Sequence, residues 1–335
     1  MTITIRHGDC REVLRTMPEA SVQTIVTSPP YWMQRDYGVD GQIGRETTLA
    51  DHCEVLVDVF REDRRVLRDD GTLWLNYGDS WASKGWKAHA TKGPPRTPAN
   101  WSSERRGFDA PATAHGKIKV KDLIGSPWQV AFALRDDGWW LRDCIIWHKL
   151  NPPPTSVRDR MCPAHEYIFL FSKSPRYFFD HEAIEEPIAQ SSADRYAQTT
   201  LQTQEGGFKQ QTYESGITGA RARSRKPSDV IKHLAASGKE TRKKRSVWPV
   251  SNPGFDEAHF ATFPAELIEP CIKAGSRVGD TVLDPFMGAG TTGLVCDRLQ
   301  RDCVGIELNP ASSIIADNRI RADGGMFADV EQFRT

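Results

Sequence analysis

The sequence has no apolar run of the roughly 18 to 20 residues that a membrane-spanning helix requires. Its opening segment, MTITIRHGDC, also lacks the charged and then apolar layout of a signal peptide. We therefore expect a cytoplasmic protein with no membrane partner. With 335 residues and 39% hydrophobic content, the chain can form one large core, or a core with a substantial insertion.

Paired cysteines are missing too. The seven cysteines lie far apart, form no C-x-x-C pair and are odd in number. This pattern suggests neither a disulfide framework nor a zinc site. We expect reduced, mostly buried thiols and no bound metal.

A net charge is absent as well, because 44 Lys and Arg residues balance 44 Asp and Glu residues. The distribution is less even. Residues 221–246 are overwhelmingly basic, and residues 83–121 are basic, rich in Gly, Pro and Ser, and interleaved with Trp86 and Trp101. Such runs are usually solvated loops. Two of them in a near-neutral protein favour one face that meets phosphates.

What the sequence does contain is an alternation of strand and helix patterns. Strands are expected within residues 3–10, 22–29, 71–79, 141–149, 165–174, 281–286 and 303–308. Helices are expected at 49–71, ending at a glycine, at 126–140 with Ser126 as N-cap, at 264–274 and at 291–300. Residues 181–247 are polar and predict a loop-rich insertion. The alternation predicts a doubly wound, mostly parallel α/β sheet.

One expected strand ends abruptly, in Ser28-Pro29-Pro30-Tyr31-Trp32. Neither proline can donate to a strand ladder, so the strand must stop there. The prolines fix a rigid, extended loop and leave their carbonyl groups free as acceptors. Taken alone, the stretch is explained equally well by a stiff turn with an aromatic lid over the core.

A glycine-rich turn lies near the other end of the chain. Gly288, Gly290 and Gly293 form G-x-G-x-x-G after an expected strand and before an expected helix. Glycines let the backbone approach a ligand, and Glu307 ends the next strand, where it can accept hydrogen bonds from a ribose. The unit predicts an adenosine-bearing cofactor. A nicotinamide dinucleotide is one answer, but a domain for it would have almost no chain left for its second half.

Read together, TSPPYW near the N-terminus and DPFMGAGTTG near the C-terminus resemble the amino-group-specific DNA methyltransferases, which use S-adenosylmethionine. The order, catalytic loop first and cofactor loop last, is that of the permuted beta group. The resemblance runs over most of the chain and implies a circularly permuted, Rossmann-like methyltransferase fold with seven strands. It assigns residues 1–180 to a catalytic half with a basic insertion at 82–121, residues 181–247 to target recognition, and residues 248–335 to a cofactor-binding half.

This resemblance gives the proline loop a chemical task. An exocyclic amino group is a poor nucleophile because its lone pair is delocalised into the ring. The Ser28 hydroxyl and the Pro29 carbonyl can accept both amino hydrogens and so stabilise the positive charge that develops. The prolines, Pro30 included, hold these acceptors rigidly. Tyr31, with Trp32 beside it, offers a face on which a flipped base can stack.

The resemblance also implies the partners. The cofactor contacts it implies are Asp284, Phe286, Gly288 and Gly290 around the methionine moiety, Phe263 and Pro264 at the methionine end, Glu307 on the ribose, and Asp9 near the adenine. Pro285 and Thr291, in the same turn, are also expected to contact the cofactor. For Asp9, an ordinary turn after a strand is an equal alternative. The partner is double-stranded DNA. We expect contacts to it from Trp32, Arg158, Arg160, Arg221, Arg223, Arg225, Lys226, Arg242, Lys243, Lys244 and Arg245. For Arg158 and Arg160, simple exposure to solvent is the alternative. A homodimer and a cognate restriction endonuclease are compatible with the family.

Several alternatives stay open. Within the family, a serine opening the motif is more common among N4-cytosine enzymes and an aspartate among N6-adenine enzymes, so Ser28 favours cytosine. A nicotinamide-dependent oxidoreductase would explain the glycines but gives TSPPYW no task, and a non-catalytic DNA-binding protein would explain only the basic stretches. Pro270-Cys271 imitates the nucleophile of C5-cytosine enzymes, but its apolar helical setting favours a buried thiol. Glu166, in HEYIFLFS, is expected to have an ordinary packing or surface role.

Overall fold

The computed structural model describes residues 1–82, 118–188, 241–252, 263–325 and 329–334. The chain divides into two compact units, one formed by Met1–Ala183 with Arg245–Thr335 and the other by Ile184–Lys244. In the described part of the second unit, the short strand β6 (Glu186–Pro187) pairs antiparallel with β7 (Thr241–Arg242).

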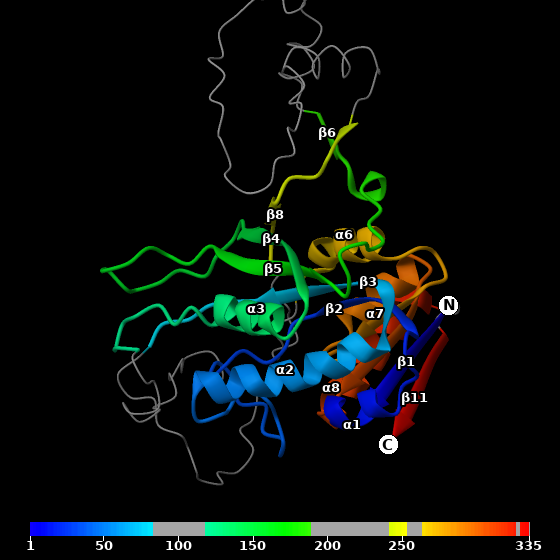
Figure 1. Ribbon diagram of the computed structural model, residues 1–335, viewed down its shortest axis with the longest axis horizontal. Coiled ribbons are helices and arrows are strands. Elements are labelled where there is room, and N and C mark those ends of the chain that lie inside the picture. Colours follow the sequence, from blue (N-terminus) through cyan, green and yellow to red (C-terminus); the bar gives the residue numbers. More distant parts are fainter. Residues whose placement is uncertain (83–117, 189–240, 253–262, 326–328, 335) are drawn as a thin grey trace, which may run out of the picture. The chain divides into compact units, whose positions relative to one another are not determined.

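A single large sheet organises the first unit (Figure 1). Its strands among the described residues are β1 (Thr2–His7), β2 (Val22–Thr27), β3 (Leu67–Tyr77), β4 (Trp140–Lys149), β5 (His165–Ser172), β8 (Val247–Val250), β9 (Thr281–Asp284), β10 (Asp302–Glu307) and β11 (Asp329–Arg334). They lie in the order β11-β1-β10-β9-β2-β3-β5-β4-β8. Only β5 is antiparallel to its neighbours, so the carboxyl ends of the other described strands share one edge.

The mostly parallel α/β sheet expected from the sequence is confirmed, but the expected seven strands are nine among the described residues. The two that the sequence pattern did not predict, β8 and β11, lie at the two edges of the sheet. Pro249 lies within β8, and an edge strand tolerates proline because one side of it needs no donor. Among the described side chains, β8 has one buried residue, Trp248, and β11 has one, Val330, so neither strand carries an apolar pattern that could be recognised in isolation.

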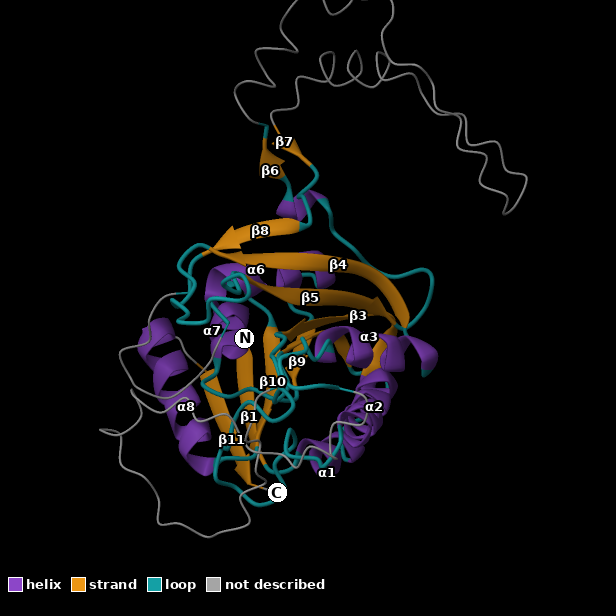
Figure 2. Cartoon of the chain, turned by 90° about the vertical axis from the view of Figure 1, so that its left-hand side faces the viewer, coloured by secondary structure: helices purple, strands orange, loops and turns teal. Residues whose placement is uncertain are grey.

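Helices cover both faces of the sheet, which makes it doubly wound (Figure 2). They are α1 (Cys10–Arg15), α2 (Leu49–Val66), α3 (Ser126–Asp136), α6 (Ala265–Gly275), α7 (Thr291–Arg298) and α8 (Pro310–Gly324). Helix α2 packs against α1 and α3 on one face, and α7 packs against α6 and α8 on the other. No helix in the described ranges is both long and apolar enough to cross a membrane.

Two helix boundaries differ from the expectation. Helix α2 ends at Val66 instead of at a glycine, and β3 begins at once with Leu67, so Gly71 lies inside a strand. Helix α3 is capped by Gly125, at a φ of 72°, and not by Ser126. The Asp79 carboxylate accepts hydrogen bonds from the Gly125 N–H at 3.0 and 3.1 Å, so a distant side chain replaces the local cap.

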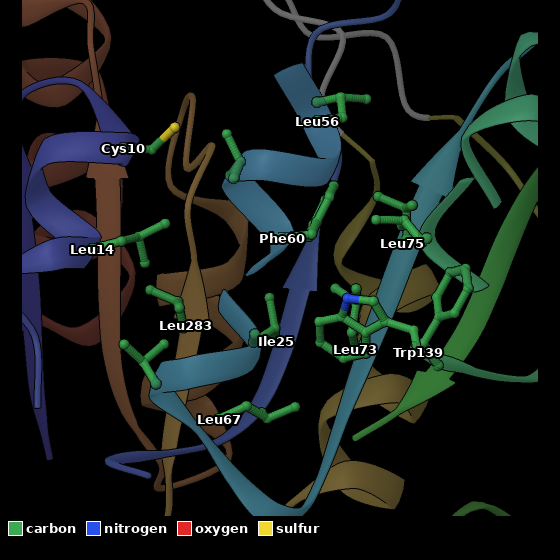
Figure 3. Close-up of a cluster of buried hydrophobic side chains, with 14 of the residues drawn as sticks. Cys10, Leu14, Ile25, Leu56, Phe60, Leu67, Leu73, Leu75, Trp139 and Leu283 are labelled. Atoms are coloured by element: carbon green, nitrogen blue, oxygen red, sulfur yellow. The ribbon is translucent and has the colours of Figure 1, made fainter. Parts of the chain in front are cut away.

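The hydrophobic core lies between the sheet and helices α1 and α2 (Figure 3). Leu56 and Phe60 of α2 are fully buried against Ile25 of β2 and Leu73 of β3. These side chains fix α2 over the strands whose carboxyl ends carry the loops described below.

All seven cysteines are free, as expected for reduced thiols. Cys10, Cys271, Cys296 and Cys303 are buried, and Cys162 is exposed. The Cys271 thiol lies in α6, is 1% exposed and donates to the Leu267 carbonyl at 3.7 Å. Its burial argues against a nucleophilic role.

A buried carboxyl group in this core has an unusual setting. Asp63 of α2 is 0% exposed, and neither of its carboxyl oxygens has a hydrogen-bond partner among the described residues. Burial raises the pKa of Asp63 well above its usual range, and the nearby Asp284 charge adds to the rise in pKa. The folded protein therefore retains a proton on Asp63 at pH values where the unfolded chain has released it.

Replacing this group, as Asp63→Asn, is expected to raise stability, and to do so more at alkaline pH. A raised folded-state pKa makes a contribution to stability that is fully present below the unfolded-state pKa. As the pH rises from the unfolded-state pKa toward the folded-state pKa, this contribution is lost by about 1.4 kcal/mol per pH unit. Asparagine cannot ionise, so that loss disappears. Urea unfolding of wild type and variant across the pH range measures the difference; Asp58→Asn, at a 67% exposed side chain of the same helix, is the control. An equal effect at every pH would contradict this ionisation.

Candidate active site

A cavity lies at the edge of the sheet where β1, β2, β9 and β10 end, and these strands are near neighbours in the sheet. We call it the strand-end cavity. Its lining residues are Gly8, Asp9, Cys10, Ser28, Pro30, Tyr37, Val39, Gly41, Gln42, Ile43, Pro285, Phe286, Gly288, Ile306, Glu307, Leu308 and Asn309. Loops that follow four different strands therefore meet there, which is where parallel α/β sheets bind ligands.

Glu307, the last residue of β10, supplies a carboxylate to this cavity. Its two oxygens accept hydrogen bonds from the backbone N–H groups of Gly288, at 2.8 Å, and Asn309, at 2.7 Å. Burial raises the pKa of Glu307 to about 7, against the lowering effect of these hydrogen bonds. A carboxylate oxygen can accept more than one hydrogen bond, so Glu307 still has capacity for donors of a ligand.

Asp284, expected to contact a cofactor, faces the protein interior instead. It is 1% exposed and does not line the cavity. Oδ1 accepts from the Thr27 hydroxyl at 2.6 Å and the Phe286 N–H at 3.1 Å, and Oδ2 accepts from the Thr292 hydroxyl at 2.6 Å. Burial raises the pKa of Asp284 to about 6, and the hydroxyl hydrogen bonds oppose this rise in pKa. Asp284 therefore joins the end of β2 to the glycine turn and to α7. It was expected to contact a cofactor, and its buried position contradicts this expectation.

The glycine turn between β9 and α7 contributes unevenly to the cavity. Gly288, Pro285 and Phe286 line the cavity. Of these, Gly288 has a positive φ, of 54°. Gly290 caps α7 at a φ of 80°, and a Cβ there would lie 2.8 Å from the Cβ of Ala316 in α8. Gly290 and Thr291, both expected as cofactor contacts, thus pack against α8 and are absent from the lining.

Two other expected contacts also lie outside the lining. Phe263 is 9% exposed and belongs to the core, and Pro264 is the residue that caps α6. Asp9, in contrast, does line the cavity, where it caps α1 by accepting from the Arg11 N–H at 2.9 Å. Burial alone would raise the pKa of Asp9, but the Arg11 side chain, which is hydrogen-bonded to it, holds the pKa below its usual value.

The proline loop reaches the same cavity. Ser28 and Pro30 are in its lining, while Pro29 is buried. The Ser28 hydroxyl donates to the Tyr31 hydroxyl oxygen at 3.1 Å. The Tyr31 ring stacks on Tyr77 of β3, with ring centroids 4.4 Å apart and an angle of 25° between the planes. Burial raises the pKa of Tyr31 well above its usual value, and the nearby Glu166 charge adds to it, so Tyr31 is a neutral phenol.

Trp32 was expected to contact DNA, and its position contradicts this. The side chain is 1% exposed, and its Nε1–H donates to the Glu46 carbonyl at 3.0 Å. Its backbone N–H donates to the Tyr77 hydroxyl at 3.0 Å. It packs in a cluster with Met33, Leu49, Ala82 and Ile124. Trp32 is therefore a core residue that anchors the proline loop.

The expected basic contacts occupy varied environments. Arg158 is exposed, whereas the Arg160 guanidinium lies 3.9 Å over the Trp81 ring. In the second unit, Arg242 forms an ion pair with Glu186 at 2.9 Å. Lys243 and Arg245 are exposed and Lys244 is half-buried. Arg221, Arg223, Arg225 and Lys226 lie outside the described residues.

Sequence reasoning missed one wall of the cavity. Tyr37, Val39, Gln42 and Ile43 lie in the loop after the proline motif and line the cavity. The available signal was the glycine spacing in DYGVDGQIG, where glycines 38, 41 and 44 all adopt positive φ. Together with Ile306 and Leu308 these residues give the cavity a largely apolar surface with a few polar groups, which suits a small organic ligand. No group of metal-binding side chains occurs within the described ranges.

Comparison with known proteins identifies a consistent set of relatives. A family model described as DNA methylase matches residues 22–317. The chain is 42% identical to the Type II methyltransferase M.Cfr9I of Citrobacter freundii, over 96% of this chain and 88% of that protein. It is also 42% identical to the Type II methyltransferase M.SmaI of Serratia marcescens, over 93% of this chain and 89% of that protein.

Solved structures share the fold. A putative DNA modification methylase of Thermus thermophilus, crystallised with S-adenosyl-L-methionine, has a TM-score of 0.57 at 24% identity and covers 99% of both chains. The PvuII DNA methyltransferase, described as cytosine-N4-specific, has a TM-score of 0.59 at 17% identity, covering 99% of this chain and 95% of that chain.

Proposed function

The chain belongs to the N6/N4 DNA methylase family, and from that premise we propose that it transfers a methyl group to N4 of a cytosine flipped out of duplex DNA. At the level of the family, it is an S-adenosylmethionine-dependent DNA methyltransferase that acts on an exocyclic amino group. The proposal adds the base, the residues and the way the base is presented.

One observation carries the assignment of residues. Ser28 and Pro30 of the proline loop line the same cavity as Phe286, Gly288 and Glu307. Their positions in the chain are about 260 to 280 residues apart, yet β2 and β9 are hydrogen-bonded neighbours. A donor held by the glycine turn and an acceptor base held by the proline loop would therefore meet in one place.

The residues of the cavity fit S-adenosylmethionine. Glu307 would accept hydrogen bonds from the ribose hydroxyls, and Phe286 and Gly288 would border the methionine moiety. Asp9 and the apolar side chains of Ile43 and Leu308 would line the adenine part. When bound, S-adenosylmethionine supplies an electrophilic methyl group on a positively charged sulfur.

The protein's own part in the reaction is to hold and polarise the amino group. The Ser28 oxygen and the Pro29 carbonyl accept its two hydrogens, and so stabilise positive charge as the nitrogen turns tetrahedral. Proline dihedral angles are fixed, so little reorganisation is needed at reaction. The Tyr31 ring, stacked on Tyr77 at one face, offers the flipped base the other. The proton released afterwards passes to solvent.

Ser28 supports cytosine as the target, since serine in this position is more common among N4-cytosine members of the family. The acceptor geometry would also serve the N6 amino group of adenine, which is therefore the alternative. An oxidoreductase would leave the proline loop unused, and a simple DNA-binding protein would leave the cavity unused.

The product identifies the base. DNA of mixed sequence, incubated with enzyme and labelled S-adenosylmethionine, digested to nucleosides and analysed by mass spectrometry, is expected to contain N4-methylcytosine. N6-methyladenine in its place would overturn the choice of base and leave the mechanism intact. Labelled methyl on neither base would overturn the function itself.

The DNA-recognition region is proposed from its position in the chain, and the partner endonuclease from the names of the relatives. We assign target recognition to the region of residues 181–247, which includes the unit Ile184–Lys244. Its basic residues, with Arg158, would supply phosphate contacts. The Type II names of the relatives support a partner restriction endonuclease for this chain, and a homodimer stays a prediction from the resemblance.

A further inference from the structure

Behind the proline loop lies a group of polar side chains that sequence reasoning did not connect to it. Asn76 is near the carboxyl end of β3, Lys149 is the last residue of β4, and Glu166 is the second residue of β5. Because β5 runs antiparallel to both neighbours, its amino end lies at the same edge of the sheet as the carboxyl ends of β3 and β4. All three side chains therefore gather beside Tyr31.

Hydrogen bonds and one ion pair connect these side chains into a continuous network. The Tyr31 hydroxyl lies 3.0 Å from Glu166 Oε2 and 3.1 Å from Asn76 Oδ1. The Asn76 amide donates to Glu166 Oε2 at 3.3 Å and to the Tyr167 carbonyl at 3.0 Å. Lys149 forms an ion pair with Glu166 Oε1. The Lys149 and Glu166 side chains are 17% and 18% exposed, so this is a mostly buried pair.

The direction of each hydrogen bond follows from the chemistry of the groups. Lys149 can only donate, and the ionised Glu166 can only accept. The single phenol proton of Tyr31 has a charged acceptor in Glu166, and hydrogen bonds to charged groups are the stronger ones. The Tyr31 oxygen is then free to accept a hydrogen bond from the Ser28 hydroxyl, which lies 3.1 Å away. Ser28 in turn keeps both oxygen lone pairs for the amino group of the substrate.

We propose that Glu166, held by Lys149 and Asn76, is a positioning residue for methyl transfer: through Tyr31 it fixes the Ser28 hydroxyl as a donor to the loop and hence as an acceptor toward the base. The inference rests on the proposed role of Ser28 and extends it to a residue on a strand 135 positions from Tyr31. An ion pair that served packing alone would have no effect on the direction of the Ser28 proton.

The variant Glu166→Gln separates these two roles because it keeps the shape of the side chain and changes its donors. Lys149 requires an acceptor, so the amide oxygen of the new side chain faces Lys149 and the amide nitrogen faces Tyr31. The Tyr31 oxygen then accepts a hydrogen bond from the amide N–H, in competition with the one that it accepts from Ser28. The Ser28 proton is no longer held toward Tyr31, and when it turns toward the base a lone pair of Ser28 is lost to the substrate. We expect the rate of methyl transfer to fall about 10- to 100-fold, the range for a hydrogen bond to a charged group.

A double-mutant cycle tests the route of the effect. In the Tyr31→Phe background the connection to Ser28 is already cut, so adding Glu166→Gln is expected to change the rate less than twofold. Single-turnover rates are measured together with the affinities for S-adenosylmethionine and DNA and with the thermal midpoint. Both affinities should stay near the wild-type values, whereas the midpoint should fall equally in the two backgrounds, because the mostly buried Lys149 loses its charged partner in each. Glu54→Gln, an exposed residue of α2, is the matched control and should behave as wild type.

The outcomes separate this inference from the proposed function. Equal losses from Glu166→Gln in the wild-type and Tyr31→Phe backgrounds would overturn the route through Tyr31. A wild-type rate for Glu166→Gln, beside a Ser28→Ala variant that has lost methyl transfer, would overturn the role of Glu166 alone. A wild-type rate for Ser28→Ala would overturn the catalytic assignment from which the inference starts.

Discussion

Replacing Ser28 by alanine is expected to slow methyl transfer by about 100- to 1,000-fold, the range found when one preorganised group that stabilises transition-state charge is removed. The hydroxyl is lost while the backbone of the proline loop is held by the Trp32 and Tyr77 contacts. Binding of S-adenosylmethionine should be unchanged, because the groups assigned to it lie on other loops. The rate is measured in single turnover with labelled methyl donor, and the affinity by calorimetry.

Ser21→Ala provides the control for this experiment. Ser21 lies at the other end of β2, just before Val22, and its hydroxyl donates to the Pro18 carbonyl at 2.8 Å, far along the strand from the cavity. That variant should methylate DNA at the wild-type rate. A Ser28→Ala enzyme of full activity would refute the assignment of Ser28 as an acceptor for the amino group. A variant that fails to bind S-adenosylmethionine would show that Ser28 acts on the cofactor instead.

Cofactor affinity is expected to fall as the pH falls below about 7, and Glu307 is the reason. Burial raises the pKa of Glu307 to about 7, so above that value the group is a carboxylate that can accept hydrogen bonds from two ribose hydroxyls. Below it, one oxygen carries a proton and acceptor capacity is lost. The dissociation constant should therefore rise toward about tenfold per pH unit on the acid side, because binding must first remove that proton.

Glu307→Gln tests this dependence because glutamine cannot ionise. The variant should bind S-adenosylmethionine more weakly than wild type at alkaline pH, and its affinity should change little with pH. Calorimetric titrations at about pH 6 and about pH 8 measure both effects. Asp284 is a second candidate, since its pKa is raised to about 6 and its carboxyl group holds the glycine turn. If the affinity of Glu307→Gln keeps the wild-type pH dependence, the titrating group is Asp284 and not Glu307.

The sequence predicted the meeting of the two motifs because that meeting depends on local patterns. Apolar strands ending in TSPPYW and in DPFMGAG place both loops at the carboxyl edge of a parallel sheet. The cavity lined by Ser28, Gly288 and Glu307 confirms that these loops lie together. The strand and helix alternation was recoverable for the same reason, since periodicity is a local property.

The orientation of individual side chains was not predictable in this way. Asp284 turns inward because the Thr27 and Thr292 hydroxyls, one of them 257 residues away, satisfy its carboxylate. Trp32 turns inward because residues from three other parts of the chain form an apolar site around it. Glu166 has its partner Tyr31 at a separation of 135 residues. Each of these side-chain orientations depends on residues that are distant in the sequence, and a local motif contains no information about them.

The inward turn of Asp284 has a consequence for how such a chain can be ordered. One carboxylate, through hydroxyl groups of β2 and α7, fastens the loop that would hold the base to the turn that would hold the methyl donor. That connection requires β2 and β9 to be neighbours in the sheet. It does not depend on which of the two strands comes first in the sequence. A gene rearrangement that moved one half of the chain past the other would leave the Thr27–Asp284–Thr292 contacts intact. The Thr27–Asp284–Thr292 contacts therefore depend on the pairing of β2 with β9 in the sheet, and not on the order of the two motifs along the chain.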